Sequence, residues 1–235
     1  MKTVLCYGDS LTWGYNPSDG ARYPFGQRWP GVLQRELGQG VRVIEEALNG
    51  RTAATDSWLL PDRNGRTLLA PLLESHAPLD LVIIMLGTND LAPSYHRTAA
   101  EVAFGCASLV WAVQKSQAGP RGGVPESLLI APPPLGKLSG FMGLFFQGGE
   151  GASQGLAQAY EVVARACGCH FLDAARFVRT SEVDGVHLEP PEHRALALAV
   201  KKVVAPILAQ GVGPSLEEKG EKPATRRQVW AGSGE

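Results

Sequence analysis

Hydrophobic residues along the chain form short runs that are separated by longer amphipathic stretches. Five runs have the length and composition of strands, and they cover residues 3–7, 41–44, 81–86, 128–131 and 169–172. The run at 81–86, Leu-Val-Ile-Ile-Met-Leu, is apolar on both faces, which is typical of a central strand in a parallel sheet. Helical patterns lie between the runs, at residues 28–38, 66–75, 98–117, 154–167 and 191–209.

The alternation of strands and helices predicts an α/β fold, a three-layer α/β/α sandwich around a five-stranded parallel sheet. We expect one domain over residues 1–210 and a disordered tail over 211–235, because the tail is rich in Gly, Pro and mixed charge. Residues 16–30 and 131–151 are expected to be long loops, which in compact domains usually have a function.

The composition is that of a globular protein without a strong charge preference. The chain has 22 Lys and Arg against 23 Asp and Glu, and 44% of its residues are hydrophobic. This balance argues against a nucleic-acid partner, which calls for a basic surface. The longest apolar runs are far shorter than the roughly 20 residues of a membrane span, so we expect no membrane association.

Cysteine spacing and the N-terminal residues bear on the compartment. Cys6, Cys106, Cys167 and Cys169 include no C-x-x-C pair, and they are too few for a structural zinc site. The first ten residues hold only about five apolar residues, fewer than the roughly 7–15 of a secretory signal. We therefore expect a cytoplasmic protein with reduced thiols.

Four polar segments follow predicted strands or precede the last helix. They are Gly-Asp-Ser-Leu-Thr-Trp-Gly at 8–14, Asn-Gly-Arg-Thr at 49–52, Gly-Thr-Asn-Asp at 87–90 and Asp-Gly-Val-His at 184–187. In open parallel sheets, ligands bind beyond the carboxyl ends of the strands. We therefore expect these segments to meet there.

Together the segments supply the groups that acyl transfer requires. Ser10, exposed at a strand-to-helix turn, is the candidate nucleophile, and His187 is the candidate base. Asp184 lies three residues before His187 and can orient its ring. The N–H of Ser10, the N–H of Gly50 and the side-chain amide of Asn89 are candidate oxyanion donors. This mechanism needs neither a metal nor a cofactor.

The same segments, in the same order, resemble the four sequence blocks of the SGNH (GDSL) hydrolases. Within that family the chain is most similar to the bacterial arylesterase branch, through residues 8–14, 43–46, 81–90, 132–135 and 146–150. The resemblance implies a flavodoxin-like SGNH hydrolase fold and hydrolysis of short-chain and aryl esters. It also implies, as in some members, acyl transfer to alcohols or peroxide and assembly into large homo-oligomers.

A second serine motif competes with Ser10. Gly-Ala-Ser-Gln-Gly at 151–155 satisfies the G-x-S-x-G pattern of the α/β-hydrolase nucleophile elbow. That motif requires a preceding strand, whereas residues 147–151 are glycine-rich and polar. We interpret Ser153 as the N-cap of the helix that begins near residue 154.

Trp13, Thr88, Phe141 and Phe145 are candidate substrate-binding residues. The two phenylalanines belong to an apolar cluster at 141–146, for which a buried core, a pocket lid and a subunit interface are alternative interpretations.

Three functions remain open from the residues. The first is a serine esterase or acyltransferase acting on a small-molecule ester, and the second is a carbohydrate esterase that removes acetyl groups with the same residues. The third is a non-catalytic binding protein on the same fold. Dinucleotide binding is disfavoured, because the first strand runs into Gly8-Asp9-Ser10 rather than G-x-G-x-x-G.

Overall fold

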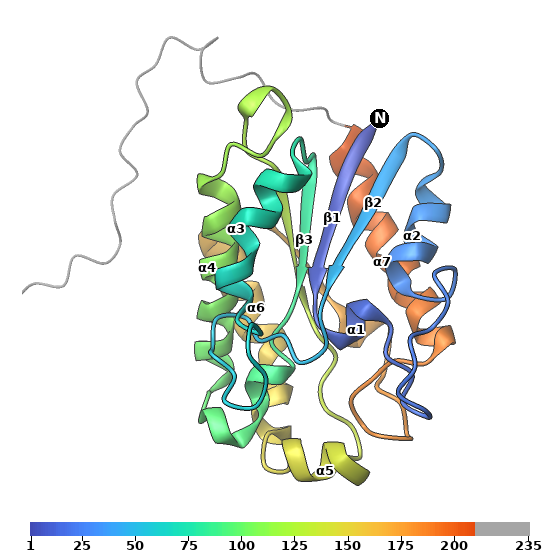
Figure 1. Cartoon of the computed structure of the whole chain (residues 1–235), viewed down its shortest axis with the longest axis vertical. Coiled ribbons are helices and arrows are strands. Elements are labelled where there is room, and N and C mark those ends of the chain that lie inside the picture. The colour runs from blue at the N-terminus through green and yellow to red at the C-terminus, as the bar shows by residue number, and fades with distance from the viewer. Residues whose placement is uncertain (210–235) are drawn as a thin grey trace, which may run out of the picture.

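One parallel sheet of five strands forms the centre of the molecule, in the order β2–β1–β3–β4–β5 (Figure 1). The strands are β1 (Lys2–Gly8), β2 (Val41–Ala47), β3 (Leu81–Met85), β4 (Glu126–Ala131) and β5 (His170–Asp173). The predicted α/β fold with a five-stranded parallel sheet is confirmed. This computed structural model describes residues 1–209, so the predicted tail at 211–235 lies outside the described residues.

Helices cover both faces of the sheet, as Figure 1 shows. On one face lie α3 (Gly65–His76), α4 (Ala99–Lys115) and α6 (Glu150–Cys167), and on the other α2 (Trp29–Leu37) and α7 (Pro190–Ala209). Alternate residues of β3 point to opposite faces of the sheet. Val82 and Ile84 join the core under α3, α4 and α6, which we call the first core. Leu81 and Ile83 join the core under α2 and α7, which we call the second core. Burial on both faces explains the uninterrupted apolar sequence of this strand.

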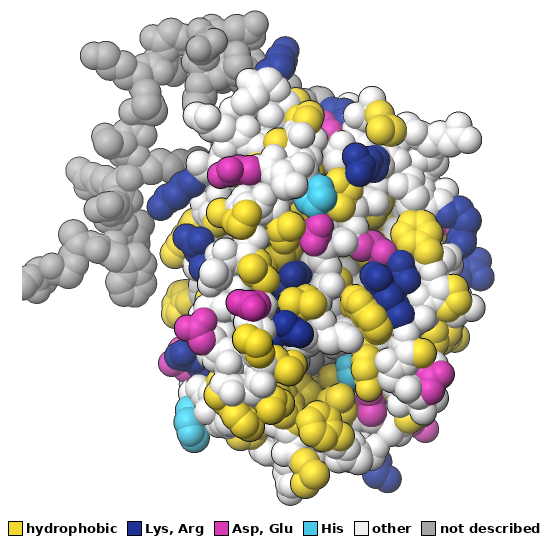
Figure 2. All heavy atoms as spheres, in the orientation of Figure 1, with side chains coloured by type: hydrophobic (Ala, Val, Ile, Leu, Met, Phe, Trp, Pro, Cys, Tyr) yellow, Lys and Arg dark blue, Asp and Glu magenta, His cyan; other side chains and the backbone are white. Residues whose placement is uncertain are grey.

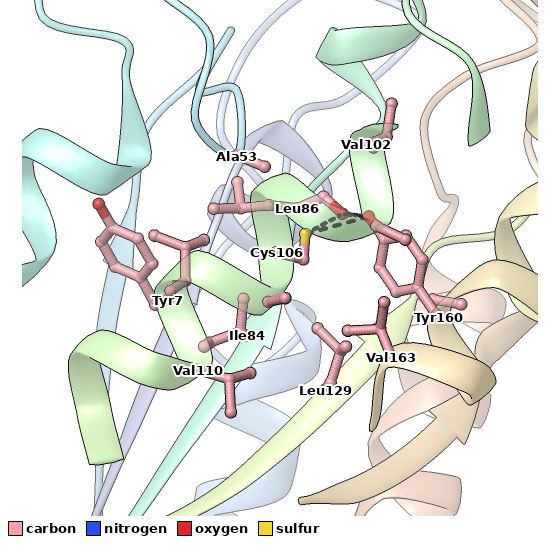
Figure 3. Packing of buried hydrophobic residues seen from close by; sticks show 14 of the residues in the cluster. Tyr7, Ala53, Ile84, Leu86, Val102, Cys106, Val110, Leu129, Tyr160 and Val163 are labelled. Carbon is pink, nitrogen blue, oxygen red and sulfur yellow. Dashed lines mark hydrogen bonds between the residues drawn. The ribbon is translucent and has the colours of Figure 1, made fainter. Parts of the chain in front are cut away.

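A polar contact inside the first core fixes the end of β3 (Figure 3). The hydroxyl of Tyr160 on α6 donates a hydrogen bond of 2.7 Å to the carbonyl of Leu86 and lies 3.2 Å from the Cys106 sulfur. Gly87 makes room for that hydroxyl, since a Cβ at this position would lie 2.1 Å from the Tyr160 oxygen. The backbone therefore leaves β3 along one defined path toward Asn89.

The segment at 131–151 differs from the expected long loop. It contains helix α5 (Gly140–Phe146), and α6 begins at Glu150 with Gly149 as its N-cap. The glycines and prolines of this segment made it look like a loop in the sequence. Helix α5 is held in place because Phe146 is buried in the first core. Ser153 therefore lies in the first turn of α6, and its interpretation as an N-cap is wrong.

All four cysteines are unpaired thiols. No helix between residues 1 and 209 combines the length and apolar character needed to cross a membrane.

Candidate active site

Ser10 lies where β1 passes into the short helix α1 (Ser10–Trp13), at the carboxyl edge of the sheet (Figure 1). Asp9 caps this helix, because its Oδ1 accepts a hydrogen bond of 2.9 Å from the N–H of Leu11. Gly14 ends the helix in a left-handed conformation. Ser10 is only 7% exposed, so the expectation of an exposed serine is corrected.

A chain of contacts joins Ser10, His187 and Asp184, three residues predicted to act together. The Nε2 of His187 lies 3.0 Å from the Ser10 Oγ, and its Nδ1 lies 2.5 Å from Asp184 Oδ2. The other Asp184 oxygen accepts the backbone N–H groups of Val186 and His187, at 2.9 and 3.0 Å. An ionised carboxylate only accepts, so Nδ1 carries the proton and Nε2 is free to accept from Ser10.

Asp184 is held in its charged form. Burial raises the pKa of this carboxyl, but the hydrogen bond and charge of His187 and the two backbone N–H groups outweigh burial and lower the pKa overall. The carboxylate therefore orients the imidazole and can stabilise its protonated form.

Tyr15 covers one face of the His187 ring. The two ring centroids are 4.2 Å apart, and the planes are inclined by 30°. The backbone N–H of Tyr15 donates to the carbonyl of Ser10 at 3.1 Å, which places the tyrosine beside the serine turn. Sequence reasoning missed this residue, because a single tyrosine after the motif at 8–14 carries no signal of the contact.

Two backbone N–H groups that follow the neighbouring strands β1 and β2 are unused. Within residues 1–209, neither Ser10 N–H nor Gly50 N–H donates to a protein acceptor. Gly50 follows β2 and has a φ of +77°, a conformation that favours glycine. Both groups are therefore available to an oxygen of a ligand.

Asn89 follows β3 and points its side-chain amide at two protein acceptors. Its Nδ2 donates to the carbonyl of Arg51 at 3.0 Å and to Asp9 Oδ2 at 3.3 Å. Both amide hydrogens are thus engaged, which the sequence did not predict. The contact with Asp9 is the longer of the two and the easier to exchange.

Two buried carboxyl groups lie behind the serine turn. Burial, assisted by the nearby charge of Asp90, raises the pKa of Asp9 to about 7, although the Leu11 N–H and the charge of Arg51 oppose the rise. Burial likewise raises the pKa of Asp90 to about 6, although this carboxyl accepts hydrogen bonds from Ala53 N–H and the Thr55 hydroxyl. Arg51 runs alongside, donating to the carbonyl of Gly8 at 3.0 Å.

The candidate substrate-binding residues fall in two places. Trp13 belongs to α1 and lies beneath the Arg22 guanidinium, and Thr88 is buried at the end of β3. Phe141 and Phe145 belong to α5, with parallel rings 6.1 Å apart. Helix α5 lies at the same end of the sheet as α1, where Figure 2 shows hydrophobic side chains around a hollow.

His193 lies against Trp29, a residue of the second core. It is fully buried, and its Nδ1 accepts the backbone N–H of Trp29 at 3.4 Å. Burial and the charges of Arg28 and His187 lower the pKa of His193 to about 3, so the ring is neutral. Within residues 1–209, no group of three or more His, Cys, Asp and Glu residues is placed to hold a metal ion.

Residues 6–195 match the model of the GDSL-like lipase/acylhydrolase family. The chain belongs to this family. It is an esterase or acylhydrolase of the SGNH type, and the resemblance seen in its four polar segments is confirmed.

Solved structures agree with this assignment. A carbohydrate acetylesterase family member from Sinorhizobium meliloti is 43% identical, with a TM-score of 0.85, and the match covers 89% of this chain and 100% of that one. The native aryl esterase of M. smegmatis is 40% identical, with a TM-score of 0.84, and the match covers 88% of this chain and 100% of that one. No match is found among curated proteins.

Proposed function

We propose that this esterase hydrolyses short-chain and aryl carboxylic esters through an acyl-enzyme on Ser10. The observation that carries the proposal is the contact chain from Ser10 Oγ to His187 Nε2 at 3.0 Å and from His187 Nδ1 to Asp184 Oδ2 at 2.5 Å. A nucleophile, a base and an orienting carboxylate in this geometry are what acyl transfer requires.

In the first half of the reaction, Ser10 Oγ attacks the ester carbonyl carbon while its proton passes to His187 Nε2. The tetrahedral intermediate then collapses, and His187 returns the proton to the departing alcohol. In the second half, water gives a proton to His187 and attacks the acyl carbon. When this second intermediate collapses, the bond from the acyl carbon to Ser10 Oγ breaks, His187 returns the proton to Oγ, and the acid leaves. An alcohol or a peroxide in place of water would give acyl transfer.

Three donors would stabilise the negative oxygen of each tetrahedral intermediate. The N–H groups of Ser10 and Gly50 have no acceptor within residues 1–209. Asn89 Nδ2 can redirect to the substrate oxygen the hydrogen bond that it donates to Asp9. The two backbone donors are fixed before the reaction, so they need no reorganisation when charge develops.

A carbohydrate acetylesterase is the second candidate, because one of the similar structures carries that name. The two activities share Ser10, His187 and Asp184 and differ in the group that leaves. Rates on acetylated xylose and on phenyl acetate separate them, and we expect phenyl acetate to be the faster substrate. A non-catalytic binding protein is disfavoured, because the contact chain is complete.

The deciding experiment uses p-nitrophenyl acetate with wild type, Ser10→Ala and Ser153→Ala. We expect Ser10→Ala to lose at least roughly 10³-fold in kcat, as in other triads, and Ser153→Ala to stay near wild type. The opposite result would refute Ser10 as the nucleophile.

The exposed apolar residues of α5 bear on self-association. Phe141 and Leu144 on α5 are 63% and 84% exposed, which supports a homo-oligomer that covers this helix. A light-scattering mass of 25.0 kDa, that of a single chain, would contradict it.

The four unpaired cysteines fit a cytoplasmic protein, in which thiols stay reduced.

A further inference from the structure

The two backbone donors of the proposed oxyanion hole share one structural feature: the carbonyl of each peptide unit is held. The Asp9 carbonyl, which precedes Ser10 N–H, accepts the N–H groups of Thr12 and Trp13 at 3.1 and 2.9 Å. The Asn49 carbonyl, which precedes Gly50 N–H, accepts the Arg63 Nε at 2.8 Å. A trans peptide points its C=O and N–H in opposite directions, so fixing the oxygen aims the N–H.

Turn geometry offers the peptide between Asn49 and Gly50 a second orientation. It is the central peptide of a turn closed by a hydrogen bond of 3.0 Å from Arg51 N–H to the Leu48 carbonyl. The φ of +77° at Gly50 matches the third position of a type II turn. A type I turn over the same four residues rotates this peptide by roughly 150–170°, which would point the Gly50 N–H away from its present direction.

Arg63 is the side chain that opposes this rotation. Its guanidinium holds the Asn49 carbonyl through Nε and the Pro61 carbonyl through Nη1, at 2.8 and 2.9 Å. Its own backbone is tied beside the turn, because its carbonyl accepts the N–H of Thr52 at 2.9 Å. The guanidinium carries a positive charge, so the contact also polarises the peptide.

The same turn also supports the third donor. The carbonyl of Arg51, its last residue, accepts the Asn89 Nδ2 at 3.0 Å. A change in the turn would therefore disturb the donor from Gly50 and the donor from Asn89 together.

We propose that Arg63 is a positioning residue of the oxyanion hole, which acts by locking the Asn49–Gly50 peptide in the orientation that presents Gly50 N–H. The inference rests on the proposed function, because it takes Gly50 as an oxyanion donor. Arg63 itself does not touch the reacting atoms. Its contribution belongs to the transition state, so it should affect kcat more than KM.

The first test replaces Arg63 with methionine, which keeps the length of the side chain and removes the donors. We expect Arg63→Met to lower kcat about 10- to 100-fold, less than the 10²–10³-fold loss that follows outright removal of a donor, with KM changed less than about threefold. Arg63→Lys should recover part of the loss, because its ammonium can still donate to Asn49. Arg66→Met is the matched control, since Arg66 is exposed and its side chain has no polar partner within residues 1–209.

The second test asks whether Arg63 merely anchors its loop. Trp58 anchors the same loop through a hydrogen bond of 3.0 Å from Nε1 to Ser94 Oγ, and Trp58→Phe removes that bond alone. A trifluoromethyl ketone forms a negatively charged tetrahedral adduct with the serine. Its affinity should fall in Arg63→Met by the same factor as kcat/KM and stay unchanged in Trp58→Phe.

Three results would overturn the inference: wild-type kcat in Arg63→Met, a loss confined to KM, or equal losses in Trp58→Phe. If Arg63→Met does not fold, judged by circular dichroism, Arg63→Lys and Arg63→Gln are compared with wild type under the same criteria. The parent proposal fails separately, since an active Ser10→Ala would refute it whatever Arg63 does. An inactive Ser10→Ala with a fully active Arg63→Met would refute the role of Arg63 alone.

Discussion

Ser10 and Ser153 both lie in the first turn of a helix, both are almost fully buried, and both belong to a glycine-containing serine motif. Their hydroxyl groups have different partners. Ser153 Oγ donates to the Glu150 carbonyl at 2.6 Å and accepts from Leu135 N–H at 3.1 Å. Ser10 Oγ instead lies 3.0 Å from an imidazole nitrogen.

The surroundings of the two serines differ in the same sense. Ser153 joins two backbone segments, and both its donor and its acceptor capacity serve structure. Ser10 stands beside the His187 imidazole and in front of two carboxyl groups, Asp9 and Asp90, whose pKa values burial raises to about 7 and about 6. Neither burial nor the serine motif therefore identifies a nucleophile. The partner of the hydroxyl does.

Removing the charge of Asp184, which orients His187, should have the largest effect on the activity that we assign to Ser10. Asp184→Asn presents an amide where the imidazole Nδ1–H needs an acceptor, and the ring can adopt the wrong tautomer. We expect kcat for p-nitrophenyl acetate to fall roughly 10³–10⁴-fold. Asp173→Asn is the matched control, because Asp173 only caps a short helical turn and asparagine also caps. Equal rates in both variants would refute Asp184 as the residue that orients His187.

The buried carboxyl of Asp90, behind the Ser10 turn, should make the free energy of unfolding depend on pH. Its folded-state pKa of about 6 is above the ordinary 3.8, so its contribution to stability is complete below the ordinary value and is lost as the pH rises through 6. Asp90→Asn keeps partners for Ala53 and Thr55 and removes this loss. We expect urea unfolding free energies to decline between pH 4 and pH 8 by about 2–3 kcal/mol less in the variant. Parallel pH curves would contradict the assignment of a raised pKa.

Ser153→Ala should affect stability and spare chemistry. The substitution leaves the buried N–H of Leu135 without its acceptor, which should cost about 1–2 kcal/mol in the free energy of unfolding. The folded variant should keep the wild-type kcat. A large loss of kcat with unchanged stability would reverse the roles of the two serines.

Tyr15 should contribute the smallest of these effects. Its ring lies on the His187 imidazole, which becomes positively charged in the proposed reaction, and an aromatic face stabilises a cation by about 1 kcal/mol. We expect kcat to fall roughly fivefold in Tyr15→Leu and to stay near wild type in Tyr15→Phe, which keeps the ring. Equal losses in both variants would show that the hydroxyl, rather than the ring, is responsible.

The strands could be predicted where burial alone determines the sequence. The runs at 3–7 and 81–86 became β1 and β3, because both faces of these strands are covered. Strand β2 extends to Ala47, past the predicted end at 44, through Glu45 and Glu46. Glu45 is tolerated in the strand because Arg28 binds its carboxylate, a contact between residues that are far apart in the sequence.

The site could be predicted as far as the geometry of a parallel sheet determines it. Carboxyl ends of parallel strands meet at one edge, so motifs at 8–14, 87–90 and 184–187 were expected to converge, and Ser10 and His187 do so. Arg63 and Tyr15 escaped prediction because both lie in irregular segments. Their contacts depend on turn geometry and ring placement, which have no periodic pattern in the sequence.

The site at which a fluorophosphonate modifies the protein shows directly which serine is the nucleophile. The reagent forms a covalent adduct with a serine whose hydroxyl is activated by a base, and mass spectrometry of peptides locates the adduct. We expect one adduct, on Ser10, formed in step with the loss of esterase activity, and none on Ser153. An adduct on Ser153, or full loss of activity with Ser10 unmodified, would contradict this expectation.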